Sequence, residues 1–129
     1  MFDHLSIGVE NLELSAVFYD ASLGPLGYVR LSQNARSVCY GPKGCTGEAP
    51  FAIIASGADA KPPDPRFHLA FVAPSREAVD RFHAAALRAG GVDEGPPGIR
   101  QSYDPGYYAA FVGDLDGHRL EAVLHERPD

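Results

Sequence analysis

Three residues of this chain are candidate metal ligands by residue type and position, and an internal repeat connects two of them. His4-Leu5 recurs 64 residues later as His68-Leu69, and at the same offset five further residues of segment 13–27 recur in segment 77–91. Such a repeat indicates two similar supersecondary modules that share one core. An imidazole at the same position of both modules predicts a metal site near the axis that relates them.

The third residue is Glu121, which lies in the apolar pattern Arg119-Leu-Glu-Ala-Val123. A carboxylate buried in such a strand needs a polar partner or a metal. Two imidazoles and one carboxylate on a concave face form a facial triad, which leaves coordination positions open for water or substrate. Each residue alone also has a structural interpretation: a lone strand histidine is commonly structural, and Glu121 alone suits the surface of an edge strand.

Hydrophobic periodicity predicts the elements that position these residues. In the first module, Asn11 is expected to cap a helix that stops at Gly24-Pro25, and in the second, Ser75 is expected to cap a helix that ends at Gly90-Gly91. Each helix follows a strand and precedes three more, so both modules are βαβββ and the fold class is α+β. We expect one domain over 1–129, with modules at 1–57 and 66–129 and strands at 2–9, 27–31, 37–40, 51–56, 67–73, 92–94, 107–112 and 118–124.

The last two strands are expected to form a hairpin closed by Asp116-Gly117, a strong two-residue turn signal. That turn pairs Val112 with Glu121 and places Tyr108 on the same face of the sheet as Glu121. A longer turn shifts the register and gives this role to Tyr107. Ordinary sheet packing is the alternative role for either tyrosine, and the two-residue turn makes Tyr108 the expected substrate-binding residue.

A loop is expected from Pro96 to Gly106, and it carries two further candidates for substrate binding, Arg100 and Tyr103. A loop of this length can act as a lid over a binding site. An arginine there can hold a carboxylate or phosphonate, although a solvated loop arginine is the simpler interpretation.

Composition limits the classes of partner. The chain has 129 residues, is 45% hydrophobic and carries a net charge of −6 without a Lys/Arg cluster, which disfavours nucleic-acid binding. No signal peptide is apparent, and the longest apolar runs are too short to span a bilayer. Cys39 and Cys45 lack zinc-site spacing and are expected to be reduced thiols of a cytoplasmic protein.

Several motifs of the chain resemble the vicinal oxygen chelate superfamily, which includes glyoxalase I, fosfomycin- and bleomycin-resistance proteins, extradiol dioxygenases and methylmalonyl-CoA epimerase. The resemblance covers essentially the whole chain. It implies that the two modules curl into one cupped, mixed eight-stranded sheet around a divalent ion (Zn, Ni, Mn, Fe or Co). The implied metal ligands are His4, His68 and Glu121, with Glu121 also catalytic, and homodimers are common among the members. The motifs are Asp3-His4-Leu5, Ala16-Val-Phe-Tyr19, Phe67-His-Leu-Ala-Phe71 and Tyr107–Val123.

One strand departs from the glyoxalase pattern. Glyoxalase-like members place a fourth ligand, Glu or Gln, on the last strand of the first module, but Phe51-Ala-Ile-Ile-Ala-Ser56 contains neither. We therefore expect a metal-dependent enzyme that acts on a small substrate with vicinal oxygens, in the lyase, isomerase, thiol transferase or dioxygenase class, and not glyoxalase I. The alternative is a non-catalytic protein that sequesters a drug or metabolite, as bleomycin-resistance proteins do.

Overall fold

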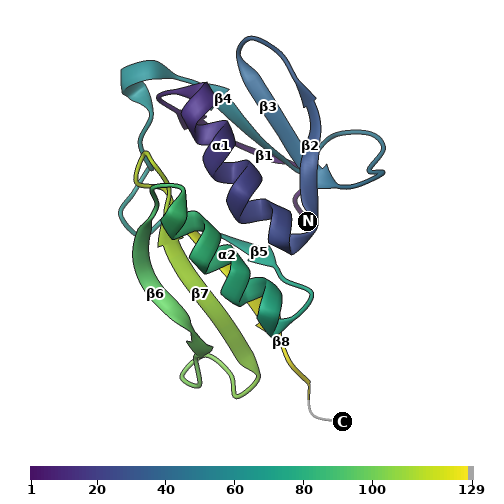
Figure 1. The fold of residues 1–129 in the computed structure, drawn as a ribbon, viewed down its shortest axis with the longest axis vertical. Coiled ribbons are helices and arrows are strands. Elements are labelled where there is room, and N and C mark those ends of the chain that lie inside the picture. The colour runs from purple at the N-terminus through teal and green to yellow at the C-terminus, as the bar shows by residue number, and fades with distance from the viewer. Residues whose placement is uncertain (128–129) are drawn as a thin grey trace.

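The computed structural model describes residues 1–127 and shows two βαβββ modules, which confirms the α+β class (Figure 1). The first module consists of β1 (Leu5–Val9), α1 (Leu12–Leu23), β2 (Tyr28–Gln33), β3 (Ser37–Pro42) and β4 (Phe51–Ala55). The second consists of β5 (His68–Val72), α2 (Arg76–Arg88), β6 (Val92–Ile99), β7 (Tyr107–Gly113) and β8 (Arg119–His125). Short 3-10 helices, Gly24–Leu26 and Gly57–Asp59, follow α1 and β4.

Each module forms its own four-stranded mixed sheet, in the orders β1-β4-β3-β2 and β5-β8-β7-β6. The first and last strands of each module pair in parallel, and the remaining pairs are antiparallel. The expected eight strands are therefore present, but within the described chain they make two sheets. As a result β1 and β5 are both edge strands, and each leaves one row of backbone N–H and C=O groups without a strand partner.

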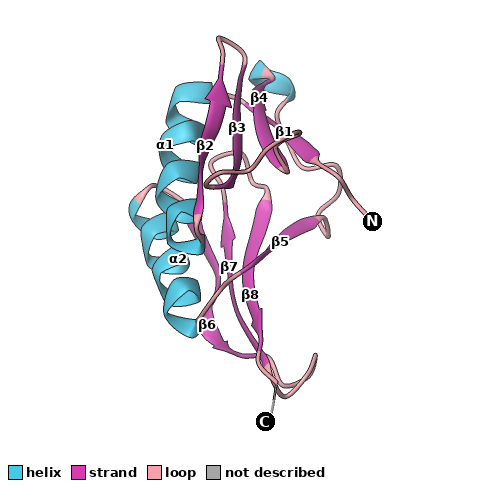
Figure 2. Ribbon diagram, turned by 90° about the vertical axis from the view of Figure 1, so that its right-hand side faces the viewer, coloured by secondary structure: helices cyan, strands magenta, loops and turns pink. Residues whose placement is uncertain are grey.

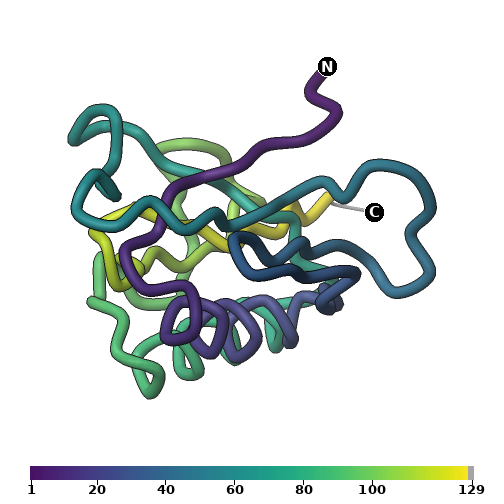
Figure 3. Tube along the Cα trace, turned by 90° about the horizontal axis from the view of Figure 1, so that it is seen from above, coloured from purple at the N-terminus to yellow at the C-terminus, as the bar shows by residue number. Residues whose placement is uncertain are grey.

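Both helices cover the same side of the two sheets and lie beside each other (Figures 2 and 3). Phe18 of α1 and Phe82 of α2 occupy the same position of the repeat, and both are fully buried. Burial of a side chain of this size contributes about 1.5–3 kcal/mol, so the matched pair helps to hold the two modules in one core.

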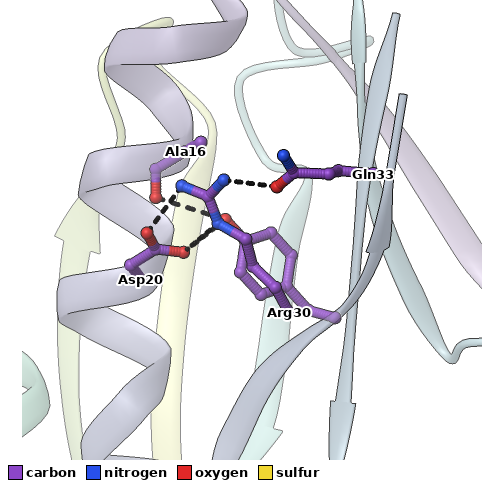
Figure 4. A network of polar contacts seen from close by, with 5 residues as sticks. Ala16, Asp20, Arg30 and Gln33 are labelled. Atoms are coloured by element: carbon purple, nitrogen blue, oxygen red, sulfur yellow. Dashed lines mark hydrogen bonds and ion pairs between the residues drawn. The ribbon is translucent and has the colours of Figure 1, made fainter. Parts of the chain in front are cut away.

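Polar side chains cap the start of each helix and fix the position of α1 on its sheet. The Asn11 side chain accepts the Leu14 N–H at 3.0 Å, and Ser75 Oγ accepts the Ala78 N–H at 3.1 Å, which confirms both expected N-caps. Along α1, Asp20 accepts two hydrogen bonds from Arg30 of β2, at 2.9 and 2.7 Å (Figure 4). A two-pronged pair of this kind fixes orientation as well as distance, so it sets how α1 lies on its sheet.

The turn between β7 and β8 has five residues, 114–118, so the expected two-residue turn was wrong. Its shape depends on Asp114, whose side chain accepts the N–H groups of Asp116 and His118 at 2.9 and 2.8 Å and the Tyr19 hydroxyl at 2.5 Å. His118 Nε2 in turn lies 2.8 Å from the carbonyl oxygen of Gly8. The turn of the second module is thereby fastened to the first module.

β6 is longer than expected and shortens the loop that follows it. The strand continues through Pro96-Pro97 to Ile99, with two register shifts against β7. Proline is tolerated here because β6 is the outer strand of its sheet and its free edge needs no N–H donor. In residues 1–127 no helix is both long and apolar enough to span a membrane.

Candidate functional site

The sheet of the second module has one face against the helices and one face away from them. On β8, Leu120 and Ala122 are fully buried against the helices, so Arg119 and Glu121 point to the opposite face. On β5 the same alternation sends His68 to that face, because its neighbour Leu69 packs toward the core. The parallel pairing of β5 with β8 therefore brings the predicted histidine and glutamate together.

Glu121 is held between two side chains. Its Oε1 lies 3.3 Å from His68 Nε2, and its Oε2 accepts a short hydrogen bond from the Tyr107 hydroxyl. Only 1% of the Glu121 surface is exposed, whereas the His68 side chain is about half exposed. Burial and the adjacent carboxylate raise the pKa of Tyr107 well above its usual value, so this phenol stays protonated and donates to Glu121.

An open cavity of about 620 Å³ lies over this cluster. Two charged side chains in its wall neutralise each other, because Arg119 Nε donates to Glu94 Oε2 at 2.7 Å. The expected substrate-binding residues Arg100 and Tyr103 both line the cavity, and the Tyr103 ring packs edge-on against Tyr107 with centroids 5.0 Å apart. The remaining lining residues are His68, Gly95, Phe111 and Glu121.

Tyr108 does not line this cavity, so its expected place on the same face as Glu121 was wrong. The five-residue turn puts Phe111, and not Val112, opposite Glu121. Tyr108 consequently points to the helix side of the sheet, where its hydroxyl donates to Asp80 at 2.7 Å. Tyr107 takes the position beside Glu121, as the alternative register predicts. The sequence signal that could have identified this register is Asp114, because an aspartate side chain commonly shapes a turn by accepting backbone N–H groups.

His4 lies apart from the other two predicted ligands. It precedes β1, its side chain is more than half exposed, and its Nδ1 is 2.7 Å from Asp3, whose hydrogen bond raises the pKa of this imidazole. It is not among the residues that line the cavity. Within residues 1–127 no three His, Cys, Asp or Glu side chains are grouped to hold one ion. A single chain thus brings together His68 and Glu121 but not His4.

The pair that does meet has the chemistry and spacing of metal ligands. Two donor atoms bound to one zinc-like ion at about 2.0–2.2 Å are separated by roughly 3–3.5 Å, and His68 Nε2 and Glu121 Oε1 are 3.3 Å apart. Tyr107 supplies the outer hydrogen bond that usually orients a ligating carboxylate. The residues present fit two of the three positions of a facial triad.

The strand registers also locate the position of the missing fourth ligand. Ala70 lies opposite Glu121 in the second module. Ser6 is the residue 64 positions before Ala70, and it lies opposite Ala52 in the first module. Ala52 is therefore the counterpart of Glu121, and it offers no donor atom.

No protein-family model and no curated protein matches the chain. Among solved structures, it is similar to a glyoxalase/bleomycin resistance protein from Albidiferax ferrireducens T118, with 36% identity, 99% of each chain covered and a TM-score of 0.80. Two more distant structures share the fold. A glyoxalase-related enzyme from Fulvimarina pelagi is 20% identical, and the similarity covers 95% of this chain and 86% of that enzyme, with a TM-score of 0.71. A genomically encoded fosfomycin resistance protein from Listeria monocytogenes is 16% identical, and the similarity covers 95% of this chain and 91% of that protein, with a TM-score of 0.67. The first of these similarities, over nearly the full length of both chains, shows that this chain belongs to the glyoxalase/bleomycin resistance protein family.

Proposed function

We propose that this protein is a divalent-metal-dependent enzyme that acts on a small molecule with two adjacent oxygens. The observation that carries the proposal is the 3.3 Å approach of His68 to the buried Glu121 in the wall of a cavity. A plain surface ion pair would not need a buried carboxylate held from its other side by a phenol. In the proposed site His68 and Glu121 are metal ligands, and Glu121 is also the catalytic carboxylate.

The third ligand in this proposal is His4 from a second copy of the chain. β1 and β5 are both open edge strands, and pairing β1 of one copy with β5 of another would satisfy both edges. His4 directly precedes β1, and His68, its counterpart in the repeat, is the first residue of β5. A junction between these two strands would therefore bring the two histidines to one site. The proposal therefore includes a homodimer with two-fold symmetry, in which the same surfaces of both chains meet.

Each protein group has a role that follows from its place. Tyr107 orients Glu121 by donating to one carboxylate oxygen and leaving the other free toward His68. Tyr103 and Phe111 give the cavity an apolar wall against which a substrate can rest. When bound, a divalent ion would supply Lewis-acid stabilisation of negative charge on chelated oxygens. Because Ala52 stands where a second carboxylate would act as base, reactions that need such a base are disfavoured, and lyase, thiol transferase and dioxygenase chemistry remain the candidates.

The metal proposal is tested by metal analysis of protein loaded with Zn²⁺ or Mn²⁺ and desalted. Wild type should retain the metal, and His68→Ala and Glu121→Ala should lose it. Glu126→Ala serves as the matched control, because Glu126 is a carboxylate just beyond β8 that pairs with Arg76 outside the cavity. Retention of the metal by Glu121→Ala would refute the assignment of this residue.

The two-chain site is tested by mixing two inactive variants. His4→Ala and His68→Ala should each lack metal, but a heterodimer of the two has one site built from unmodified residues. Random exchange would make half of the dimers mixed, so about one quarter of the sites should recover metal. No recovery after verified exchange would show that His4 and His68 do not act across the dimer.

The cavity also supports the alternative function, which is sequestration of a drug or metabolite without catalysis. Its size and its aromatic wall suit an organic ligand, and the part of a single chain that the structure describes brings together only two candidate metal ligands there. Wild-type protein that retains no metal but binds a bleomycin-type drug would favour this second function over the enzyme.

A further inference from the structure

The cavity contains one arginine that forms no ion pair with any carboxylate of residues 1–127. Arg119 is paired with Glu94, and His68 faces Glu121. Arg100 also lines the cavity, yet within residues 1–127 it takes part in no ion pair. In a chain with a net charge of −6, an unpaired guanidinium in a cavity wall is a feature that an anionic ligand would complete.

Arg100 is held in one place before any ligand arrives. Its backbone N–H donates to the Tyr107 carbonyl at 2.7 Å, and its Nη2 donates to the Pro96 carbonyl at 2.6 Å. The guanidinium carbon lies 5.4 Å from the centre of the Phe111 ring, and the residue is about half buried. A side chain fixed in this way loses little conformational freedom on binding, which favours affinity.

Two glycines of β6 make the space for the guanidinium. A Cβ atom added to Gly95 would lie 3.2 Å from Arg100 Nη2, and one added to Gly98 would lie 3.1 Å from Nη1. Both glycines sit at the register shifts of β6, where the strand bends locally. Larger residues at either position would push the guanidinium from its present place, so the irregular strand forms a cradle for Arg100.

The cradle places the charge next to the proposed metal ligands. The backbone hydrogen bond from Arg100 to Tyr107 puts Arg100, just past the end of β6, beside the first residue of β7, and the Tyr107 hydroxyl reaches Glu121. We propose that Arg100 binds the anionic group of the substrate, so that the cavity takes a small carboxylate or phosphonate. This inference rests on the proposed function in one respect: the adjacent oxygens of the same molecule would reach His68 and Glu121.

The test uses metal-free protein and two simple probes, methylphosphonate and acetate, in an NMR titration of backbone amides at low salt. Wild type should bind in a saturable way, with the largest shifts at Gly95, Gly98 and Tyr107. Arg100→Gln should bind at least tenfold more weakly. Arg100→Lys, which keeps the charge but loses the two-pronged geometry, should be intermediate. The matched control is Arg88→Gln, which removes the same charge from an exposed position on α2 and should bind within twofold of wild type.

Equal affinity of wild type and Arg100→Gln, or shifts centred away from Gly95 and Gly98, would overturn the inference. The tighter of the two probes identifies the anionic group as phosphonate or carboxylate. Zn²⁺ affinity, measured separately on the same proteins, distinguishes the two proposals. Arg100→Gln should keep the affinity of wild type for Zn²⁺, and His68→Ala should keep anion binding while losing Zn²⁺. Anion binding by a wild type that binds no metal would leave Arg100 supported and the metal proposal refuted.

Discussion

Removing the Tyr107 hydroxyl tests the central part of the site, because this group is the partner of one oxygen of a buried carboxylate. In Tyr107→Phe the ring and its packing remain, but Glu121 Oε2 loses its hydrogen bond. His68 is still available to the other oxygen. The change therefore isolates one polar interaction.

The size of the effect follows from burial. A hydrogen bond to a charged group contributes about 1.5–3 kcal/mol. The cavity is open, so water can replace part of this interaction, and we expect a loss near the lower end, about 1.5 kcal/mol in metal-free protein. For a domain of this size that corresponds to a fall in Tm of roughly 5 °C. Loss of an outer partner of a metal ligand typically weakens metal binding about 10–100-fold.

The assay compares Tyr107→Phe with Tyr108→Phe, the adjacent tyrosine on the other face of the sheet. Tyr108 donates to the exposed Asp80, so its loss should change stability by less than about 0.5 kcal/mol and leave metal affinity unaltered. Thermal unfolding gives the stability, and competition with a chromophoric chelator gives the Zn²⁺ affinity. Equal effects of the two substitutions would refute the reasoning, since only one of them touches Glu121.

Four further predictions concern stability, reaction class and assembly. Asp114→Ala should lower the free energy of unfolding by about 3 kcal/mol or more, because three donors lose a buried acceptor, whereas Asp114→Asn should lose clearly less; urea unfolding measures both. Burial raises the pKa of Tyr19 and Tyr40 above the usual 10.0. The unfolded chain loses these protons first, so the stability that these protonated groups contribute should be fully present well below pH 10 and should fall as the pH rises through and above 10; an unfolding free energy that stays flat between pH 9 and 11 would contradict this. With Ala52 in place of a carboxylate base, turnover of methylglyoxal with glutathione by metal-loaded protein should be about 10²–10⁴-fold below that of an enzyme with the base, and ordinary enzyme rates would show that another group supplies it. Light scattering at high micromolar concentration should give the mass of a dimer, and a monomer would argue against the two-chain site.

Much of the fold could be predicted from local pattern. The apolar spacing and the caps at Asn11 and Ser75 predicted both helices, because helix starts depend on side chains within a few residues of each other. The repeat predicted the two modules, and the residue types together with the family resemblance grouped His68 and Glu121 in one expected site, which the pairing of β5 with β8 brings together. These features depend on neighbours in sequence or on one strand pairing.

The errors arose where one residue contacts a distant part of the chain. Asp114 lengthens the last turn while it binds Tyr19 of the other module, and this shift exchanged Tyr108 for Tyr107 at the site. In β6, prolines that suggested a loop lie on a free sheet edge, where their missing donors cost nothing.

Residue types and spacing by themselves determined the modular α+β fold and singled out His68 and Glu121 as candidate metal ligands. Only the tertiary structure decided where His4 lies relative to that pair and which tyrosine lies beside Glu121. The physical reason is that strand periodicity sets which face a side chain occupies. The shape of the β7–β8 turn and its attachment to the first module depend on contacts between residues as far apart as Gly8 and His118.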